Sequence, residues 1–270
     1  MRSPSLPPAV HLVILGLFLT LPIASATAQA TRDESRLVIG VATGYIAGSD
    51  LWTVARQPIL SNSGSNDVFR LSRRIRPNFA IVGQATWYSR GNLGFTGELS
   101  YLGLGTVDGC GLVEASGSLL NRLACDAIDE FEHPASVVGL GGGIVFRPAS
   151  RAFLQPYLRG VGGIAIAPRS TVKMVGAIGV VGDSIFTIYP ESRGSDARLS
   201  GSISIGVATP ATAGYQLHLE FRNNWVQLPI VTGPSQYQGI VPPTKSVWKA
   251  LPSFLVGFDV VLEKRRGRRY

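Results

Sequence analysis

Residues 214–225 alternate between apolar and polar side chains without interruption. One set of alternate positions is mainly apolar and consists of Tyr215, Leu217, Leu219, Phe221, Asn223 and Trp225. The other set is polar or charged and consists of Gln216, His218, Glu220, Arg222 and Asn224. This period of two predicts a β-strand with one apolar and one ionic face. From Tyr215 to Trp225 the strand extends about 33 Å, which a tilt of about 40° projects to about 25 Å, the height of a lipid-facing band. The stretch therefore predicts a membrane-spanning strand of a β-barrel.

The N-terminus has the three parts of a secretory signal peptide. Arg2 precedes an apolar run from Ala9 to Leu21. Small residues then alternate toward the expected cleavage site, at Ala24, Ala26, Ala28 and Ala30. We therefore expect residues 1–30 to be removed on export. A single membrane anchor is the alternative, but the run is shorter than the ~20 apolar residues of a spanning helix. No cysteine lies near the cleavage site, so a lipoprotein is not expected.

The length and composition of the chain favour a single large all-β domain in residues 31–270. The 32 glycines, the 16% of charged residues and the positive mean hydropathy argue against a disordered chain. No segment after the signal contains the ~18 consecutive apolar residues of a spanning helix. A closed β-barrel reconciles these facts, because only alternate residues need be apolar and every backbone group pairs within the barrel.

Eight segments share this alternation and are predicted as barrel strands. They are Leu37 to Tyr45, Asn78 to Ser89, Leu93 to Gly105, Ala135 to Arg147, Leu154 to Ile166, Leu199 to Thr209, Tyr215 to Trp225 and Phe254 to Glu263. The connections are alternately long and short, so four long loops lie at one end and three short turns at the other. In transmembrane barrels the long loops are extracellular and the turns periplasmic. The prediction is therefore an eight-stranded antiparallel up-and-down transmembrane β-barrel.

Three of the long connections carry more specific expectations. Ile46 to about Pro77 is expected to be a long polar connection. The apolar runs Val172 to Val181 and Ile185 to Tyr189 are expected to extend a hairpin beyond the bilayer. After Trp225 we expect a fourth long loop, rich in proline and glycine.

Aromatic residues at the strand ends give a separate indication of a membrane. Those at the long-loop ends of the outward faces are Tyr45, Tyr101, Trp225 and Phe254. Those at the short-turn ends are Trp87, Phe95, Phe146 and Tyr215. Two such girdles are typical of membrane barrels, with chance placement as the alternative.

The segment Pro156 to Gly163 reads Pro-Tyr-Leu-Arg-Gly-Val-Gly-Gly. It is similar to the Pro-Tyr-x-x-x-Gly-x-Gly strand of small outer-membrane barrels of the OmpA and OmpX type. The resemblance covers nearly all of residues 36–263 and implies the outer membrane of a Gram-negative-type bacterium, with outer-membrane lipids as partners. Gly257, Val260 and Leu262 resemble the terminal-strand signal read by the barrel-assembly machinery, a further expected partner. The chain departs from that signal because seven residues follow Glu263 and no terminal Phe ends the strand.

Cys110 and Cys125 are the two cysteines of the chain. In an exported chain, an even count with this spacing predicts a structural disulfide, which is worth about 3 kcal/mol in the chain-entropy model. A nucleophilic cysteine and a metal pair are the alternatives, and neither has supporting partners in the sequence. No metal or cofactor is expected.

A set of charged residues falls on the inward faces of the predicted strands. It consists of Glu98, Arg147, Arg159, Glu220, Arg222, Asp259 and Glu263. Unpaired charges in an enclosed interior are costly, so we expect these residues to pair across the lumen, Arg222 with Glu98, Glu220 or Asp259. The resemblance implies such a network, and eight strands leave only enough width for side chains. An open porin is therefore disfavoured.

Two patterns could indicate catalysis or cofactor binding. Gly160 to Ala165 formally matches a dinucleotide fingerprint, but that motif needs a following helix and a parallel sheet. We interpret its glycines as making room for large side chains of neighbouring strands. His218 shares its face with Glu220 and Arg222, away from lipid, so a structural histidine is favoured over a lipid-modifying catalyst. No catalytic residue is predicted.

The formal charge of +8 owes much to the tail at residues 264–270, which is expected to be periplasmic. Its basic residues are Lys264, Arg265, Arg266, Arg268 and Arg269. The tail is interpreted as a solvated terminus, with contact to anionic headgroups as the alternative. Nucleic acid is not an expected partner of an exported chain.

The leading functional hypothesis is a non-enzymatic, monomeric outer-membrane barrel that serves envelope integrity or surface binding through its long loops. One alternative is a narrow or gated channel for small solutes, and another is a lipid-modifying outer-membrane enzyme. A soluble calyx-like carrier would have its faces reversed, with the ionic residues in water. The sequence identifies no extracellular ligand.

Overall fold

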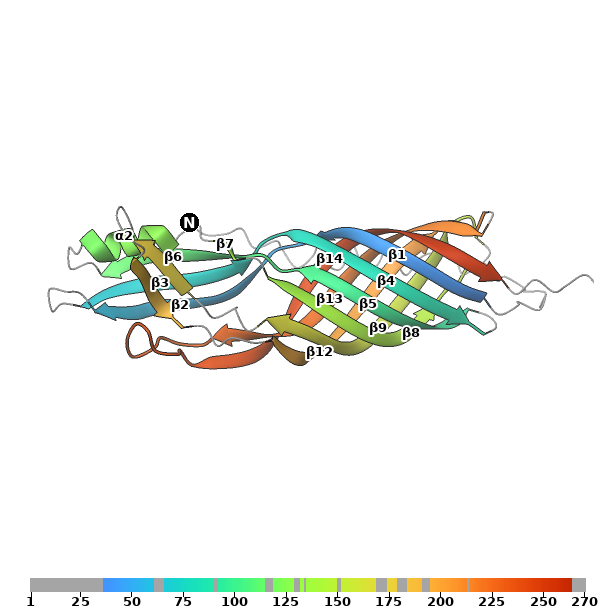
Figure 1. Cartoon of the computed structure of the whole chain (residues 1–270). Helices are drawn as coiled ribbons and strands as arrows, with labels where there is room; N and C mark the ends of the chain where they lie inside the picture. The colour runs from blue at the N-terminus through green and yellow to red at the C-terminus, as the bar shows by residue number, and fades with distance from the viewer. Residues whose placement is uncertain are drawn as a thin grey trace, which may run out of the picture. The chain divides into compact units, whose positions relative to one another are not determined.

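The computed structural model describes residues 36–60, 66–89, 92–114, 119–128, 132–133, 135–149, 152–168, 174–178, 184–190, 195–212 and 214–263 (Figure 1). The predicted signal peptide at residues 1–30 and the basic tail at residues 264–270 lie outside these ranges. The described ranges hold fourteen strands and one helix, α2 (Leu119–Ile128). No helix in them is both long and apolar enough to cross a membrane.

Eight of the strands form a closed barrel. They are β1 (Arg36–Ile46), β4 (Asn78–Tyr88), β5 (Leu93–Gly103), β8 (Ser136–Phe146), β9 (Gln155–Pro168), β12 (Ser195–Ala208), β13 (Tyr215–Val231) and β14 (Thr244–Glu263). Each strand pairs antiparallel with the next in this order, and β14 closes the barrel against β1 (Figure 1). Closure leaves no unpaired edge. The predicted eight-stranded antiparallel up-and-down barrel is therefore confirmed.

The period-two pattern of each barrel strand separates an exposed apolar face from a buried inner face. On β13, Leu219 is 45% exposed whereas Glu220 is 1% exposed. The same sense holds on β1, where Ile39 is exposed and Val38 is buried. The faces assigned from the alternation are thus the faces that the barrel presents.

The connection between β1 and β4 differs from its prediction. Residues 46–77 are not a polar loop, because they form β2 (Ser49–Leu60) and β3 (Asn66–Ile75), which pair antiparallel. β3 also pairs with β6 (Thr106–Glu114), which pairs with β7 (Glu132–His133), so the four strands form one sheet. The physical reason is a second apolar face, since Phe69, Leu71 and Ile75 of β3 are all buried.

Two further long connections also contain more structure than predicted. β10 (Met174–Ile178) and β11 (Ser184–Tyr189) pair with each other, but they form a separate sheet and do not continue β9 and β12. β13 and β14 remain paired as far as Val231 and Thr244. The loop predicted after Trp225 is therefore reduced to residues 232–243.

We call β2, β3, β6, β7, α2, β10, β11 and residues 232–243 the loop module. Its buried apolar side chains include Leu51, Trp52, Val54, Ile59, Phe69, Leu71, Ile75, Ile128, Met174, Ile188 and Tyr189. They are continuous with inward residues at the adjacent end of the barrel, such as Val226 and Leu228. Backbone hydrogen bonds from Arg76 N–H to Gly105 O and from Ala47 N–H to Pro252 O lie where the chain passes between the barrel and the module. The long connections are thus a folded extension of the barrel.

Candidate functional site

The barrel interior is built in layers along its axis. The short-turn end is filled by a buried cluster of Val38, Tyr88, Val145, Tyr157, Ala208 and Val261. The long-loop end is filled by small and branched apolar side chains, which include Ala42, Ala80, Val82, Leu102, Val137, Ala165 and Leu255. Charged and amide side chains lie between these two apolar layers. An ionic layer of this kind requires that its members satisfy one another.

Arg222 lies at the centre of the ionic layer. Its Nη2 donates to Glu98 Oε2 at 2.8 Å, and its Nε donates to Glu220 Oε1 at 2.8 Å. These are two of the three partners that the sequence predicts for Arg222. The third, Asp259, has other partners. Because Arg222 and both carboxylates are buried, Arg222 supplies positive charge to both carboxylates, and they in turn compensate its charge.

Arg159 and Tyr157 complete the surroundings of Glu220. Arg159 Nη1 lies 3.1 Å from Glu220 Oε2, and the Tyr157 hydroxyl donates to the same oxygen at 2.7 Å. Arg159 also donates to the amide oxygen of Gln84, which in turn donates to Asp259 at 3.1 Å. Gln84 therefore links the arginine cluster to the second carboxylate centre of the interior.

Asp259 is held by three side chains from two strands, β4 and β13. Gln216 donates to its Oδ2 at 2.7 Å, Gln84 donates to its Oδ1, and His218 Nδ1 lies 3.0 Å from Oδ2. His218 packs over Gly257, where a Cβ atom would clash with the imidazole. Gly257, which the sequence indicates only as part of a terminal-strand signal, thus makes room for the histidine.

The structure does not bring Arg147 into this network. Its guanidinium lies over the ring of Tyr88 at the short-turn end, with Cζ 4.6 Å from the ring centroid. None of the described ion pairs includes Arg147, so its predicted place in the network is wrong. The reason is that Arg147 follows the last residue of β8 and lies beyond the level of the carboxylates. The side chain of Glu263 lies outside the described part of the chain.

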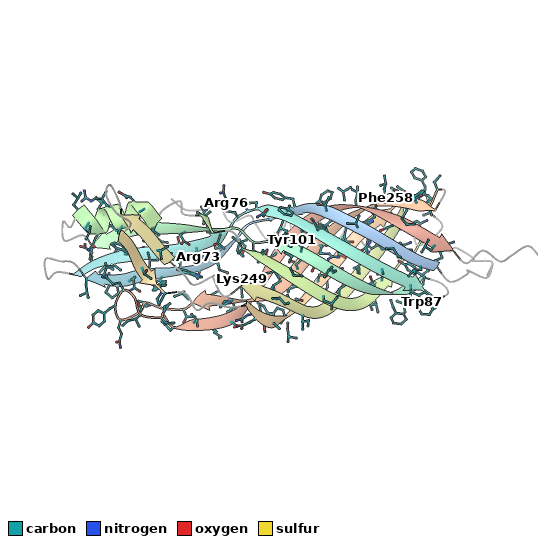
Figure 2. The ribbon with its side chains drawn as sticks, in the orientation of Figure 1. Arg73, Arg76, Trp87, Tyr101, Lys249 and Phe258 are labelled. Carbon is teal, nitrogen blue, oxygen red and sulfur yellow. A yellow bond between two sulfur atoms is a disulfide. The ribbon has the colours of Figure 1, made fainter. Side chains whose placement is uncertain are left out.

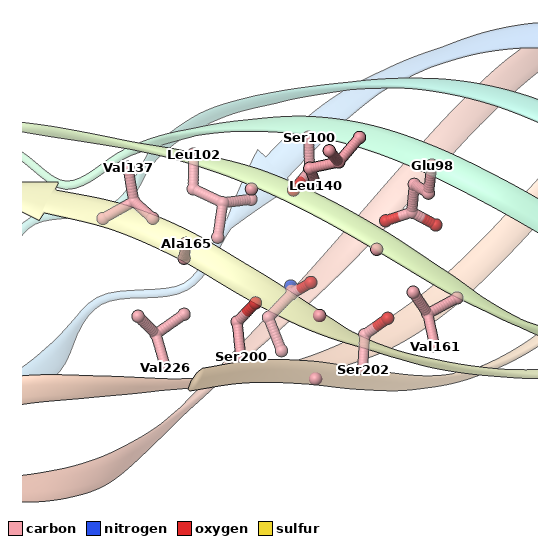
Figure 3. A pocket seen from close by; sticks show the side chains of 15 residues that line it. Glu98, Ser100, Leu102, Val137, Leu140, Val161, Ala165, Ser200, Ser202 and Val226 are labelled. Carbon is pink, nitrogen blue, oxygen red and sulfur yellow. The ribbon is translucent and has the colours of Figure 1, made fainter. Parts of the chain in front are cut away.

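A small cavity lies beside Glu98, between the ionic layer and the apolar layer at the long-loop end (Figure 3). Its volume of about 30 Å3 is room for one or two water molecules. Ser100, Ser200 and Ser202 line it together with several glycines. The space suits water that solvates a carboxylate and is far too small for a drug-sized ligand.

Aromatic side chains gather near both ends of the outer barrel surface (Figure 2). The predicted girdle residues Tyr45 and Phe254 at one end, and Trp87, Phe95, Phe146 and Tyr215 at the other, are all exposed. Tyr101 and Trp225 are partly exposed. The rings of Phe79 and Tyr101 stack with centroids 5.5 Å apart, and those of Tyr215 and Phe258 with centroids 5.4 Å apart. Phe79 and Phe258 were missed as girdle residues although their outward parity could have identified them.

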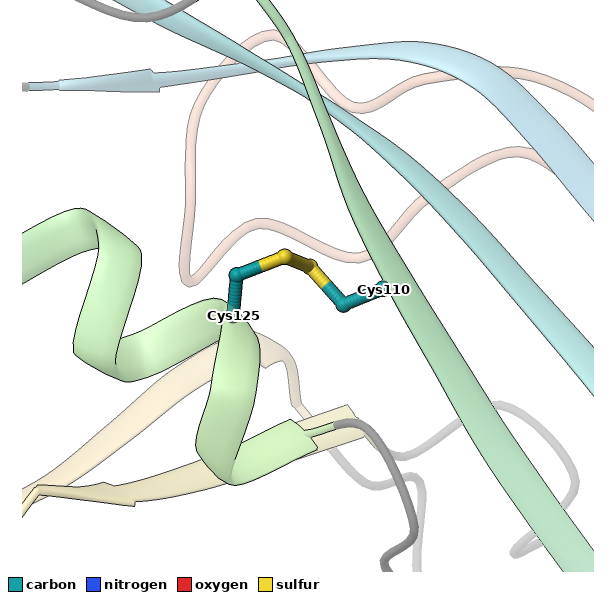
Figure 4. The surroundings of a disulfide bond; sticks show 2 residues. All are labelled: Cys110 and Cys125. Carbon is teal, nitrogen blue, oxygen red and sulfur yellow. A yellow bond between two sulfur atoms is a disulfide. The ribbon is translucent and has the colours of Figure 1, made fainter.

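The loop module is held together by a disulfide between Cys110 on β6 and Cys125 on α2 (Figure 4). The two Cα atoms lie 5.3 Å apart. A hydrogen bond from Asn121 Nδ2 to Asp67 Oδ2, 2.5 Å long, joins the same helix to β3. α2 is therefore attached to two strands of the four-stranded sheet.

A buried ion pair and a buried amide join the long connections to one another. Arg73 on β3 donates to Asp108 on β6 at 2.6 Å, and both side chains are fully buried. Gln57 on β2 accepts from the Tyr189 hydroxyl at 2.8 Å and from Ser235 N–H at 2.9 Å. Burial raises the pKa of the Tyr189 phenol, which keeps it protonated as a donor. Gln57 thus connects the first, third and fourth long connections.

Comparison with known proteins gives structural likeness alone. No family model matches the chain, and no curated protein matches it in sequence. Among solved structures, neisserial surface protein A is 13% identical, covering 84% of this chain and 99% of that chain, with a TM-score of 0.41. OprG, an outer-membrane protein from Pseudomonas aeruginosa, is 9% identical, covering 86% of this chain and 98% of that chain, with a TM-score of 0.46.

A third similar structure is Ail, the attachment invasion locus protein of Yersinia pestis, in complex with a heparin analogue. It is 10% identical, covering 85% of this chain and 100% of that chain, with a TM-score of 0.40. The eight-stranded barrel of the present chain rests on its own closed strand pairing.

Proposed function

We propose that the chain is a non-enzymatic integral outer-membrane protein whose folded loop module binds partners at the cell surface. The observation that carries the membrane assignment is an apolar side chain exposed near the middle of every barrel strand. These residues are Ile39, Ile81, Leu99, Leu140, Ile164, Ile203, Leu219 and Val256. A continuous apolar belt is far larger than the few hundred Å2 of patch that soluble monomers expose. A lipid bilayer would cover this belt and so keep its apolar side chains out of water. The two aromatic girdles suit the two boundaries of the lipid.

The burial pattern argues against the soluble carrier. A calyx would place apolar side chains inside and polar ones in water. In this barrel Glu98, Glu220 and Arg222 are inside and buried. The apolar layers at both ends and the small cavity between them also disfavour a channel that is open at rest.

The lipid-modifying enzyme lacks support from the position of His218. Its ring lies in the barrel interior, against Asp259 and Tyr157. A catalyst acting on lipid would need to present its reactive group to the outer surface. We therefore assign His218 and Asp259 to structure, with the loop module as the binding part of the molecule.

Cysteine labelling on intact cells tests the proposed orientation. Val241→Cys lies in the loop module at an exposed position, and Ala211→Cys lies at an exposed position in a short turn between β12 and β13. A membrane-impermeant maleimide should label Val241→Cys on intact cells and Ala211→Cys only after the outer membrane is permeabilised. Labelling of Ala211→Cys alone would invert the topology. Recovery of both variants in the soluble periplasmic fraction would overturn the membrane assignment.

A channel or an enzyme would be revealed by separate measurements. The purified protein in planar bilayers should give no single-channel conductance, and the mass of outer-membrane lipids should not change when the protein is expressed. Steady conductance would favour the narrow channel. A lipid mass shift that Ala replacement of His218 abolishes would favour the enzyme.

A further inference from the structure

The two faces of β3 carry arginines with different surroundings. Arg73 points into the loop module, where it is buried and paired with Asp108. Arg70 and Arg74 have the opposite parity and are exposed, and so is Arg76, directly after the end of β3. No described ion pair includes Arg70 or Arg74. The sheet thus pairs its inner arginine with a carboxylate and presents Arg70 and Arg74 to solvent.

The strands beside this arginine row contribute small side chains. Arg70 is opposite Gly111, and Ser72 is opposite Gly109 on β6 and Thr53 on β2. A Cβ atom added at Gly111 would meet nothing within 4 Å. On β6 the residue opposite Arg70 is therefore a glycine with open space above it, whereas the residue opposite Arg74 is Val107.

Two adjoining surface depressions lie along the arginine row. One, of about 610 Å3, is lined by Arg70, Arg74, Ser72 and Thr53 among others. The second, of about 720 Å3, is lined by Arg74, Arg76 and Ser49 among others. Both include Arg74 and Asp50, so they form one continuous shallow surface with hydroxyl groups and cations along it. No aromatic residue lines either depression.

Among the described residues that line this surface, arginines outnumber carboxylates. Asp108 is paired with Arg73 and Glu114 is paired with Arg56, which leaves Asp50 as the carboxylate opposite Arg74. Lys249 donates to the backbone carbonyl of Asp50 at 2.8 Å and adds a further ammonium at the edge. Figure 2 labels Arg76 and Lys249 near the junction of the loop module and the barrel.

We propose that this surface binds an extended acidic polysaccharide that carries sulfate or phosphate groups. Arg70 and Arg74 are four residues apart on one strand and so lie about 13 Å apart, which is too far for a single small anion to engage both. Guanidinium forks bind such oxyanions through paired charge-assisted hydrogen bonds. The hydroxyls of Thr53, Ser72 and Ser49 suit sugar hydroxyls. Single-stranded nucleic acid would call for aromatic stacking platforms, which this surface lacks.

The direction of the arginine row favours a soluble polysaccharide over membrane headgroups as its ligand. Arg76 lies three residues before the girdle residue Phe79, whereas Arg70 lies nine residues before it. Nine residues of strand span about 30 Å, and the headgroup layer adds only about 5 to 8 Å on each side of the hydrocarbon. The row therefore extends well past the headgroups. This inference rests on the proposed surface-binding role of the loop module.

Binding of fluorescent dextran sulfate to the full mature protein in phosphatidylcholine vesicles tests the inference, with uncharged dextran as the ligand control. Arg70→Gln with Arg74→Gln should weaken binding about tenfold. The matched variant, Arg122→Gln with Lys245→Gln, removes the same charge at exposed positions off the row and should change binding less than about twofold. Asp50→Asn removes the opposing carboxylate and should tighten binding, a gain that misfolding cannot produce.

Three outcomes would overturn the inference. They are equal losses in the two double variants, binding of uncharged dextran with the same affinity, and tighter capture of phosphatidylglycerol vesicles than of dextran sulfate. The measurement uses purified protein and does not depend on cellular topology. Failure here would therefore leave the cysteine-labelling test of the membrane orientation untouched.

Discussion

The barrel and the loop module use the same alternation with opposite burial. On β13 the apolar Leu219 is exposed and the charged Glu220 and Arg222 are buried. On β3 the apolar Leu71 is buried and the charged Arg70 is exposed. The reversal takes place between β3 and β4, where Ile75 is buried and Phe79 is exposed. In the proposed membrane assignment each face takes the polarity of the medium beside it, so the reversal would mark where lipid gives way to water.

The two regions also differ in how they handle arginine. The barrel holds Arg222 between Glu98 and Glu220, while the module holds Arg73 with Asp108 and leaves Arg70 in solvent. Buried charges depend on their partners, whereas exposed ones are screened by water. Stability should therefore be sensitive to the first two arginines and tolerant of change at the third.

The largest expected effect is the loss of Arg222. Arg222→Leu leaves Glu98 and Glu220 buried without their shared cation, and should lower the free energy of unfolding by about 3 to 5 kcal/mol. Arg222→Lys should retain most of that stability if charge pairing is the cause. Urea unfolding in lipid vesicles measures both variants. Arg70→Leu is the control, since it removes the same side chain from the exposed face of β3. A similar loss in Arg70→Leu and Arg222→Leu would remove the distinction between the two regions.

Removing the disulfide should affect the loop module and spare the barrel. The double variant Cys110→Ser with Cys125→Ser should lose about 3 kcal/mol of local stability. Hydrogen exchange should show reduced protection of α2 and β6 with unchanged protection of β13. In the unreduced wild-type protein, neither cysteine should react with a thiol reagent. Equal loss of protection in the barrel would mean that the two regions unfold as one unit.

A smaller effect is expected at Gln57. Gln57→Leu leaves the Tyr189 hydroxyl and the Ser235 N–H without their shared acceptor, at a cost of about 1 to 3 kcal/mol. Tyr189→Phe removes one of these orphaned groups, so the double variant should lose less than the sum of the single losses. Hydrogen exchange of the β2 and β11 amides measures the stability losses of the two single variants and the double variant. Strictly additive losses would show that the amide does not couple the long connections.

The barrel could be predicted closely because one rule applies to all eight strands. Most outward positions are apolar, so parity identified the faces of each strand from Leu37 to Leu262. The predicted ends of β13 and β14 are wrong where this rule no longer applies. β14 begins ten residues before Phe254, and β13 continues past Trp225, because strand pairing there does not require outward residues to be apolar.

The loop module could not be predicted by the same rule. Phe69, Leu71 and Ile75 do alternate with polar residues, but Arg73 occupies a buried position in that series and conceals the apolar face. Its partner Asp108 lies 35 residues away on another strand. The interior pairs have the same difficulty, since Glu98 and Arg222 are 124 residues apart. Parity identifies which charges face inward and does not tell which of them meet.

The central claim is that exposed side chains of the barrel lie in lipid and those of the loop module lie in water. Leu219 on β13 and Thr53 on β2 are both exposed, so replacing each with arginine places the same charge on the two surfaces. Urea unfolding in lipid vesicles should show a loss of about 2 to 4 kcal/mol for Leu219→Arg. Thr53→Arg should stay within about 0.5 kcal/mol of the wild type, as expected of a water-facing surface. Equal effects of the two substitutions, small or large, would contradict the account.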